Sequence, residues 1–297
     1  MNQNEFKSGF AGIIGMPNVG KSTLLNQLIG QKIAIISDKP QTTRDKILAI
    51  YTTEEEQIVF TDTPGIHKPH NRLGEYMVKV ANESMQDMDV LLFLVDVTRN
   101  IQETERRIAE SIQKAGVPCI LVMNKIDLVQ KETLLPLIAD YSNLYDFDVI
   151  VPMSAKTGDG AEILLEKIKE YLQPGPKFYY DDMVTDQQEK QIAAEIIREK
   201  LLWLLDKEVP HGIAIEIEKM QEQERITKIH ASIYCEKASH KGIIIGKNGE
   251  MLKKVGAMAR LDIEKMLEKK VYLELWVKVK TDWRNNNRLI RNFGFEG

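Results

Sequence analysis

The pattern of apolar residues changes its character once along the chain, near residue 173. Up to Leu172, short apolar runs alternate with segments whose apolar residues recur every three or four positions. The runs predict strands and the periodic segments predict helices, which is typical of an α/β fold with a mostly parallel sheet covered on both faces. The predicted strands are Phe10–Ile14, Ile47–Tyr51, Gln57–Phe60, Val90–Val95, Cys119–Met123 and Val149–Val151, and the predicted helices are Lys21–Ile29, Gly74–Met85, Gln102–Lys114, Lys131–Leu144 and Asp159–Tyr171.

A Pro-Gly-Pro run at positions 174–176 ends this alternation. Because proline and glycine interrupt regular structure, residues 174–186 are interpreted as a linker between a first domain at 1–173 and a second at 187–297. The second domain is predicted to be α+β, in the order helix, strand, strand, helix, glycine loop, helix, strand. Its helices are expected at Ile192–Leu205 and Met251–Leu267, and its strands at Gly212–Glu218, Thr227–Cys235 and Val271–Val279.

The first chemical motif runs from Gly15 to Ser22, between a predicted strand and a predicted helix, and reads Gly-Met-Pro-Asn-Val-Gly-Lys-Ser. This pattern is typical of a phosphate cradle, because its glycines let backbone N–H groups turn inward and the helix N-terminus adds its positive dipole end. Lys21 is expected to reach the β- and γ-phosphates, and the Ser22 hydroxyl to bind Mg²⁺. The nucleotide-binding residues predicted here are Gly15, Asn18, Val19, Gly20, Lys21, Ser22 and Thr23.

A second motif, Asp62-Thr63-Pro64-Gly65, follows the predicted strand that ends at Phe60. Ligands of parallel sheets bind at the carboxyl ends of the strands, so this turn is expected to face the phosphates. Asp62 is predicted to hold Mg²⁺, usually through water, and the Gly65 N–H to meet a γ-phosphate oxygen. Thr63 belongs to the same predicted nucleotide-binding set.

A third motif, Asn124-Lys125-Ile126-Asp127, indicates that the base is guanine. Guanine presents an N1–H and an exocyclic amine side by side, and one carboxylate at Asp127 accepts both. Adenine offers no such pair of donors, so it would leave the carboxylate unpaired. Asn124 is expected to support the base edge and the loop, and Lys125 to lie along the ring.

A fourth motif, Ser154-Ala155-Lys156, follows the last predicted strand of this domain. Its position places the N–H of Ala155 to donate to guanine O6, with Ser154 and Lys156 beside it. The tripeptide is weak evidence alone and gains its value from the strand that precedes it.

These four motifs, in this order and each at a strand end, resemble those of the Ras-like translation-factor class of P-loop GTPases, from about Phe6 to Leu172. The resemblance implies that Thr43, within the sequence Gln-Thr-Thr-Arg-Asp, closes over GTP and completes the Mg²⁺ shell. Thr42 is the other candidate. From the residues alone, this segment is a polar loop that can order and disorder.

One position departs from the Ras-like pattern. Where Ras-like enzymes carry a glutamine that orients the attacking water, this chain has Ile66. Similar enzymes with an apolar residue here hydrolyse GTP without that group, and an asparagine at the position of Asn18 often accompanies a K⁺ ion. The resemblance therefore implies that Asn18 helps to hold K⁺, while a role in capping its own turn remains the alternative. The predicted catalytic set is Lys21, Thr43, Gly65 and Asn18.

His67 and His70 form an H-x-x-H pattern that resembles a metal site. Pro69 breaks the helix that would bring both imidazoles to one face, and no cysteine or acidic ligand pair is near. The segment is interpreted as a polar loop.

The second domain carries a glycine loop, Gly242 to Gly249, between two helical segments and with lysines in and after it. This setting resembles the RNA-binding KH loop, whose backbone clamps single-stranded nucleotides, and the element order matches the bacterial type II KH fold. A small α+β interaction domain is the alternative. Trp283 either stacks on bases with the neighbouring arginines or packs on its own domain. The predicted RNA-binding residues are Gly242, Ile245, Gly246, Lys247, Asn248, Gly249, Lys253 and Lys254.

Charge is distributed unevenly along the chain. The net charge of -4 divides into 19 basic and 24 acidic residues at 1–180, 7 and 13 at 181–236, and 14 and 7 at 237–297. The last segment is therefore basic, which suits a polyanion. Cys119 and Cys235 fall in apolar runs of different domains and are expected to be reduced core residues. The polar N-terminus and the shortness of the longest apolar run, Val90–Val95, predict a soluble intracellular protein.

The whole combination, a GTPase domain joined by a short linker to a KH domain, resembles the bacterial Era family. The resemblance implies Mg²⁺ with GTP or GDP, binding near the 3′ end of 16S ribosomal RNA, and action in small ribosomal subunit assembly and maturation. It also implies a cytoplasmic location with peripheral contact with the inner membrane in some members, and no obligate protein partner. Two alternatives remain: a GTP-regulated protein-interaction switch without RNA, and a P-loop kinase or ATPase.

Overall fold

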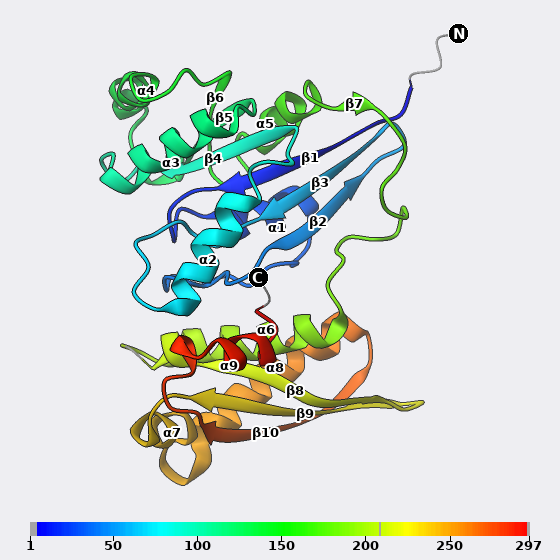
Figure 1. Cartoon of the computed structure of the whole chain (residues 1–297). Helices are drawn as coiled ribbons and strands as arrows, with labels where there is room; N and C mark the ends of the chain where they lie inside the picture. The colour runs from blue at the N-terminus through cyan, green and yellow to red at the C-terminus, as the bar shows by residue number, and fades with distance from the viewer. Residues whose placement is uncertain (1–4, 208, 296–297) are drawn as a thin grey trace. The chain divides into compact units, whose positions relative to one another are not determined.

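The computed structural model describes residues 5–207 and 209–295. The chain divides into two compact units, whose main parts are the residues up to 186 and the residues from 187 onward (Figure 1). The expectations for the extreme N-terminus include residues 1–4, which lie outside the described residues.

The first unit is built on a sheet with the strand order β2-β3-β1-β4-β5-β6. Neighbouring strands are parallel except that β2 is antiparallel to β3, and the short β7 pairs antiparallel with the start of β1. The mostly parallel sheet is therefore as predicted. The strands are β1 (Lys7–Ile14), β2 (Ile47–Thr52), β3 (Glu56–Asp62), β4 (Val90–Asp96), β5 (Cys119–Asn124), β6 (Val149–Met153) and β7 (Gln173–Pro174).

Helices cover both faces of this sheet (Figure 1). Leu24 of α1 and Leu164 of α5 belong to the core on one face, whereas Ile108 of α3 and Tyr141 of α4 belong to the core on the other. The central strand β4 is buried along its whole length, which explains its uninterrupted apolar sequence. The helices are α1 (Lys21–Ile29), α2 (Arg72–Glu83), α3 (Glu103–Ala115), α4 (Leu134–Ser142) and α5 (Ala161–Lys169).

The start of α4 differs from the prediction by three residues. The expected helix began at Lys131, but residues 131–133 form a separate 3₁₀ turn and α4 begins at Leu134. Pro136 then lies in the first turn of α4, where its missing N–H costs no helical hydrogen bond. Periodicity alone did not locate this boundary.

The segment predicted as a linker, residues 174–186, lies along the first unit. The carboxamide of Gln57 in β3 accepts from the N–H groups of Phe178 and Tyr179 at 2.7 and 3.0 Å, and donates to the Tyr179 carbonyl at 3.0 Å. Further along, the Thr185 hydroxyl donates to the Leu48 carbonyl at 2.7 Å. The segment is therefore bound along β2 and β3 through most of its length.

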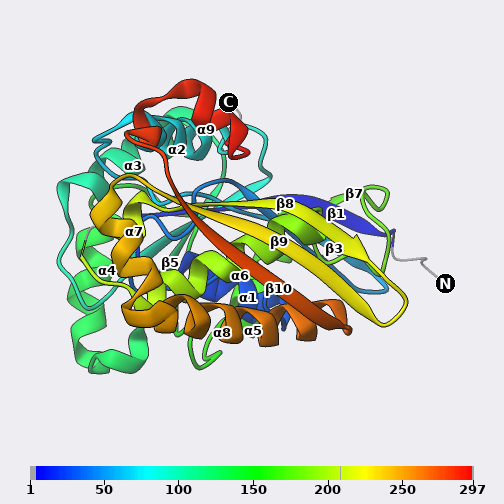
Figure 2. The ribbon, with the colours of Figure 1, turned by 90° about the horizontal axis from the view of Figure 1, so that it is seen from below.

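The second unit is an α+β domain with the strand order β10-β9-β8. β10 is parallel to β9, and β8 is antiparallel to it (Figure 2). Apolar residues of α6, α7 and α8 pack on one face of this sheet, against Ile229, Ala231 and Ile233. The elements are α6 (Glu189–Leu204), β8 (Ala214–Glu222), β9 (Ile226–Cys235), α7 (Ala238–Ile245), α8 (Glu250–Leu267), β10 (Lys270–Val279) and α9 (Asn287–Asn292).

Trp283 is fully buried within the second unit. Its Nε1–H donates to the Gly212 carbonyl at 2.9 Å, and its ring lies edge-on to Phe293 with centroids 5.2 Å apart. Of the two alternatives for this residue, packing on its own domain is therefore correct and stacking on bases is wrong.

No helix in the described parts of the chain is both long and apolar enough to cross a membrane. Both cysteines are buried and unpaired with each other, and burial raises the pKa of the Cys119 thiol above its usual value.

Candidate functional site

The loop between β1 and α1 forms a tight cradle that requires its glycines. Gly15 and Gly20 have φ values of +153° and +104°. A Cβ on Gly15 would lie 2.4 Å from the Leu94 carbonyl oxygen, and one on Gly20 would lie 2.3 Å from Asn124 Nδ2. Both contacts are too short for any side chain, so the two glycines let β4 and β5 approach the loop closely.

Lys21 folds back over the loop from the first turn of α1. Its Nζ donates to the carbonyls of Gly15 at 3.3 Å and Met16 at 2.9 Å. The side chain is only 6% exposed, and burial lowers its pKa to about 8, although Asp62 opposes this shift. A buried ammonium within a ring of backbone groups is a ready partner for an anion.

Three side chains converge beside Lys21: Ser22 at the start of α1, Thr43 in the 41–45 loop and Asp62 at the end of β3. The Ser22 hydroxyl donates to Asp62 Oδ2 at 2.7 Å and lies 2.9 Å from the Thr43 hydroxyl. Thr43 also donates to Asp62 Oδ2 at 3.3 Å, whereas the Thr42 hydroxyl donates away from the cluster, to the Lys39 carbonyl. The geometry thus separates the two threonines that the sequence left open.

The donor set of this cluster fits a hard cation. Asp62 is fully buried, and its Oδ1 has no hydrogen-bond partner within the described part of the chain. Burial raises the pKa of this carboxyl, against the opposing effect of Lys21. No cluster of three or more His, Cys, Asp or Glu that could hold a metal occurs among the described residues, so a cation here would depend on hydroxyls, this carboxylate and ligand oxygens.

Gly65 lies directly against the phosphate cradle. A Cβ at this position would be 2.7 Å from the backbone nitrogen of Pro17. The N–H of the next residue, Ile66, donates to the Gly15 carbonyl at 3.1 Å, and the Thr63 hydroxyl donates to the Ile13 carbonyl at 2.9 Å. The start of this loop is therefore joined to β1 and the cradle.

Asn124 connects the two predicted base-binding loops to the cradle. Its Nδ2 donates to the Val19 carbonyl at 2.7 Å, and its Oδ1 accepts from the Ala155 N–H at 2.8 Å. The sequence predicted that the Ala155 N–H donates to guanine O6. In this structure it donates to the Asn124 side chain instead. Ser154 is fully buried beside it, and Lys156 is exposed.

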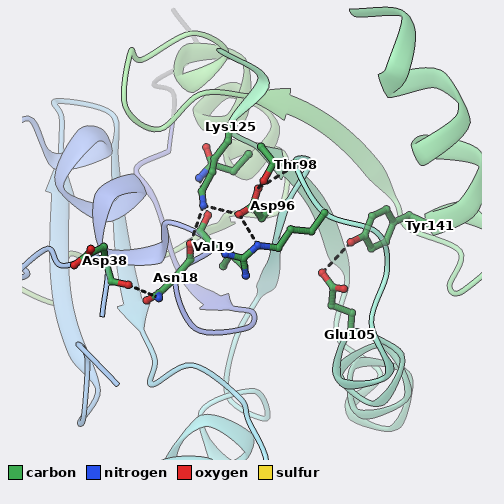
Figure 3. A network of polar contacts seen from close by, with 10 residues as sticks. Asn18, Val19, Asp38, Asp96, Thr98, Glu105, Lys125 and Tyr141 are labelled. Atoms are coloured by element: carbon green, nitrogen blue, oxygen red, sulfur yellow. Dashed lines mark hydrogen bonds and ion pairs between the residues drawn. The ribbon is translucent and has the colours of Figure 1, made fainter. Parts of the chain in front are cut away.

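Lys125 is anchored by a carboxylate that the sequence analysis did not single out. Its Nζ lies 2.5 Å from Asp96 Oδ2 at the end of β4 and donates to the Asn18 carbonyl at 2.9 Å (Figure 3). Burial raises the pKa of Asp96, but hydrogen bonds from Lys125 and Thr98 outweigh it and hold the pKa below its usual value. Asp127, two residues beyond Lys125, is exposed.

Asn18 has a left-handed backbone, with φ of +65°. Its Nδ2 donates to the Asp38 carbonyl at 2.6 Å, so the side chain reaches the loop before Thr43 rather than capping its own turn (Figure 3).

A pocket lies between the cradle and the segment that carries Thr43. It is lined by Pro17, Asn18, Gly20, Lys21, Ser22, Thr23, Ile35, Ile36, Ser37, Gln41, Thr42, Thr43 and Gly65.

The glycine loop of the second unit joins α7 to α8. Gly246 has φ of +76°, and a Cβ there would lie 2.7 Å from the Cβ of Met251. Asn248 and Gly249 also have positive φ, at +52° and +78°. Gly242 and Lys247 are exposed, whereas Ile245 is packed against the core and supports the loop from beneath.

A groove runs from this loop between α8 and β10. Exposed Lys253 and Arg260 line it, and Lys254 is exposed beside them. Its lining combines apolar residues with the two basic side chains and one acidic residue, Glu274. Apolar surface beside basic side chains suits bases and phosphates of a single strand. The groove is lined by Gly249, Leu252, Lys253, Gly256, Ala257, Arg260, Leu273, Glu274 and Leu275.

Two family models match the chain. The model of a 50S ribosome-binding GTPase matches residues 10–125, and the KH domain model matches residues 208–284. They cover the cradle, the Asp62 motif and the first two residues of the Asn124 motif in the first unit, and the glycine loop in the second.

Relatives and solved structures match over nearly the whole length. GTPase Era of Ruminiclostridium cellulolyticum is 51% identical and that of Clostridioides difficile 54%, each alignment covering 98% of this chain and 98% or 99% of the relative. Crystal structures of Era with MgGDPNP and nucleotides 1506–1542 of 16S ribosomal RNA, and of an Aquifex aeolicus Era variant with GDP·AlF₄⁻, have TM-scores of 0.96 and 0.95. Both are 40% identical to this chain and cover 98% of it, with 100% of their own length matched. The chain therefore belongs to the Era family of GTPases.

Proposed function

We propose that this GTPase binds the 3′ end of 16S ribosomal RNA through its KH domain, acts in assembly and maturation of the small ribosomal subunit, and uses GTP to set its affinity for RNA. The observation that carries the proposal is the glycine loop at 246–249, whose positive φ values leave the backbone open beside a basic groove. The Era structure with 16S RNA nucleotides, which is similar over the full length, supports the choice of RNA.

In the nucleotide site, we assign the phosphates to the cradle and Lys21, and the base to the loops of Asn124, Asp127 and Ala155. Ser22, Thr43 and Asp62 are the residues that would hold Mg²⁺, because their oxygens already converge within hydrogen-bond distance. Bound there, Mg²⁺ would neutralise charge on the phosphate oxygens. The Gly65 N–H then serves a γ-phosphate oxygen.

Ile66 has no polar side-chain atom that could orient water, so charge stabilisation must come from other groups. We assign part of it to K⁺ held with the help of Asn18, whose side chain already spans the cradle and the 36–43 segment. Such a cation acts where charge develops in the transition state.

Turnover of GTP is expected to be at least about tenfold faster in K⁺ than in Na⁺, since a cation of the wrong size loses the stabilisation. Asn18→Asp should remove most of this difference, whereas Asn143→Asp, at an exposed position of the same domain, should preserve it. Phosphate release at matched ionic strength measures both. Equal turnover in the two salts, unchanged by Asn18→Asp, would exclude K⁺.

The loop at Lys247 is expected to make a phosphate contact with RNA. Lys247→Ala should weaken binding of a single-stranded RNA with the 16S 3′-end sequence by about tenfold and reduce the slope of log K against log salt by about 0.7. Lys265→Ala is the matched control, because Lys265 is an exposed lysine on the last turn of α8. Filter binding with increasing salt measures both variants.

The same assay tests coupling to the nucleotide. RNA should bind more tightly with a non-hydrolysable GTP analogue than with GDP, and by linkage RNA should raise the affinity for the analogue by the same factor. Equal RNA affinity in both nucleotide states would refute the coupling. If Lys247→Ala retains as much RNA as the parent at every salt concentration, the loop assignment is refuted.

The cytoplasm is the compartment that this partner implies. Peripheral contact with the inner membrane stays a prediction.

A further inference from the structure

His67 lies between the two loops that flank the phosphate cradle. Its Nδ1 is 2.8 Å from the Gly65 carbonyl oxygen, and its Nε2 is 3.0 Å from Gln41 Nε2. The ring is half-buried. It therefore bridges the Asp62–Gly65 turn and the segment that carries Thr43, and the two residues in contact, Gln41 and His67, are 26 positions apart along the chain.

The two contacts select one of the two neutral tautomers of the ring. An amide nitrogen only donates, so Gln41 Nε2 must donate to His67 Nε2. The proton of the neutral imidazole is then on Nδ1, which donates to the Gly65 carbonyl. One tautomer thus satisfies both ring nitrogens at once.

The peptide between Gly65 and Ile66 is consequently bound on both sides. Its carbonyl accepts from His67 Nδ1, and its N–H donates to the Gly15 carbonyl at 3.1 Å. On the side of the cradle, Gly65 lies so close to Pro17 that an added Cβ would be 2.7 Å from the Pro17 backbone nitrogen. The cradle therefore holds this peptide through its N–H, and His67 holds it through its carbonyl.

We propose that His67 is a positioning residue for GTP hydrolysis, which transmits the position of the Gln41 segment to the backbone of Gly65. Gln41, where the bridge begins, precedes Thr43 by two residues and has a left-handed backbone with φ of +61°. Because Ile66 has no polar side-chain atom, the reaction relies on backbone donors, whose effect depends on accurate placement. This inference rests on the proposed contact between the Gly65 N–H and the γ-phosphate.

Two substitutions separate the two ends of the bridge. The amide of asparagine lies one bond beyond Cγ, like Nδ1, so His67→Asn keeps a donor for Gly65 and loses Gln41. The amide of glutamine lies two bonds beyond Cγ, like Nε2, so His67→Gln keeps a partner for Gln41 and loses Gly65. Each variant should lower kcat by about tenfold, the effect of one lost hydrogen bond, while KM and GDP affinity stay within about twofold.

Gln41→Ala removes the same bond as His67→Asn. The double variant should therefore have the kcat of either single variant, rather than the product of two losses. His70→Asn, on an exposed histidine of the same loop, is the matched control and should hydrolyse GTP like the parent. Single-turnover phosphate release without RNA measures kcat, and fluorescent GDP binding measures affinity.

A purely structural role would lower the melting temperature of His67→Asn and His67→Gln or raise KM without the selective loss of kcat, and either result overturns the proposal. So would multiplicative losses in the double variant. Gly65→Ala distinguishes this inference from the assignment on which it rests: if Gly65→Ala hydrolyses GTP normally, the Gly65 contact is wrong. If Gly65→Ala is inactive and the His67 variants are normal, the positioning role alone is wrong.

Discussion

Lys21→Met should abolish GTP hydrolysis almost completely without weakening the fold. Methionine has a similar length, so it fills the buried space within the cradle, but it has no charge and no donor for the Gly15 and Met16 carbonyls. Loss of a cation that stabilises developing phosphate charge should lower kcat by about 100-fold or more. Phosphate release and binding of fluorescent GTP measure the effect.

The stability of Lys21→Met should not fall with its activity. Burial lowers the pKa of Lys21 to about 8, below its unfolded value, so at neutral pH the folded state bears the cost of a buried ammonium. Removing that charge should leave the melting temperature of the nucleotide-free protein unchanged or higher at pH 7. Lys114→Met, at an exposed position on α3, is the control for lysine loss as such. Hydrolysis within tenfold of the parent would contradict the role of Lys21.

The sequence predicted the parts of the site that depend on local pattern. Each motif follows an apolar run, and because the runs became parallel strands of one sheet, Gly15, Asp62, Asn124 and Ala155 meet at the carboxyl ends of β1, β3, β5 and β6. The fold class and the family were confirmed for this reason. In the second unit, the positive φ of Gly246 agrees with the interpretation of its glycine loop.

Contacts between loops could not be predicted, because they join residues that are far apart in the sequence and belong to no repeating helix or strand pattern. Asp96 and Lys125 meet across β4 and β5, and His67 meets Gln41, without any signal in the sequence around them. His67 was noticed for its spacing from His70, although its contacts come from elsewhere. The pattern of residues alone does not distinguish Thr42 from Thr43, and only the family resemblance favoured Thr43. In the structure the Thr43 hydroxyl lies beside Ser22, whereas the Thr42 hydroxyl donates to the Lys39 carbonyl.

Asp127→Asn should change the nucleotide that the protein prefers from GTP to xanthosine triphosphate. Xanthine has a carbonyl where guanine has its exocyclic amine, so its edge offers one donor and one acceptor. An asparagine amide matches that edge, whereas the Asp127 carboxylate matches the two donors of guanine. We expect the affinity for GTP to fall by about 100-fold and that for xanthosine triphosphate to rise, because a mismatched edge leaves polar groups unpaired.

Competition against fluorescent GDP by GTP, xanthosine triphosphate and ATP measures this change. Asp140→Asn, an exposed aspartate on α4, should leave all three affinities unchanged. The loop of Asp127 is fixed by Lys125, which is bound to Asp96 and Asn18, so the substitution should alter the base-reading group and not the position of the loop. If Asp127→Asn binds GTP as tightly as the parent, the guanine edge is read by another residue, and the assignment of this loop as the base site fails.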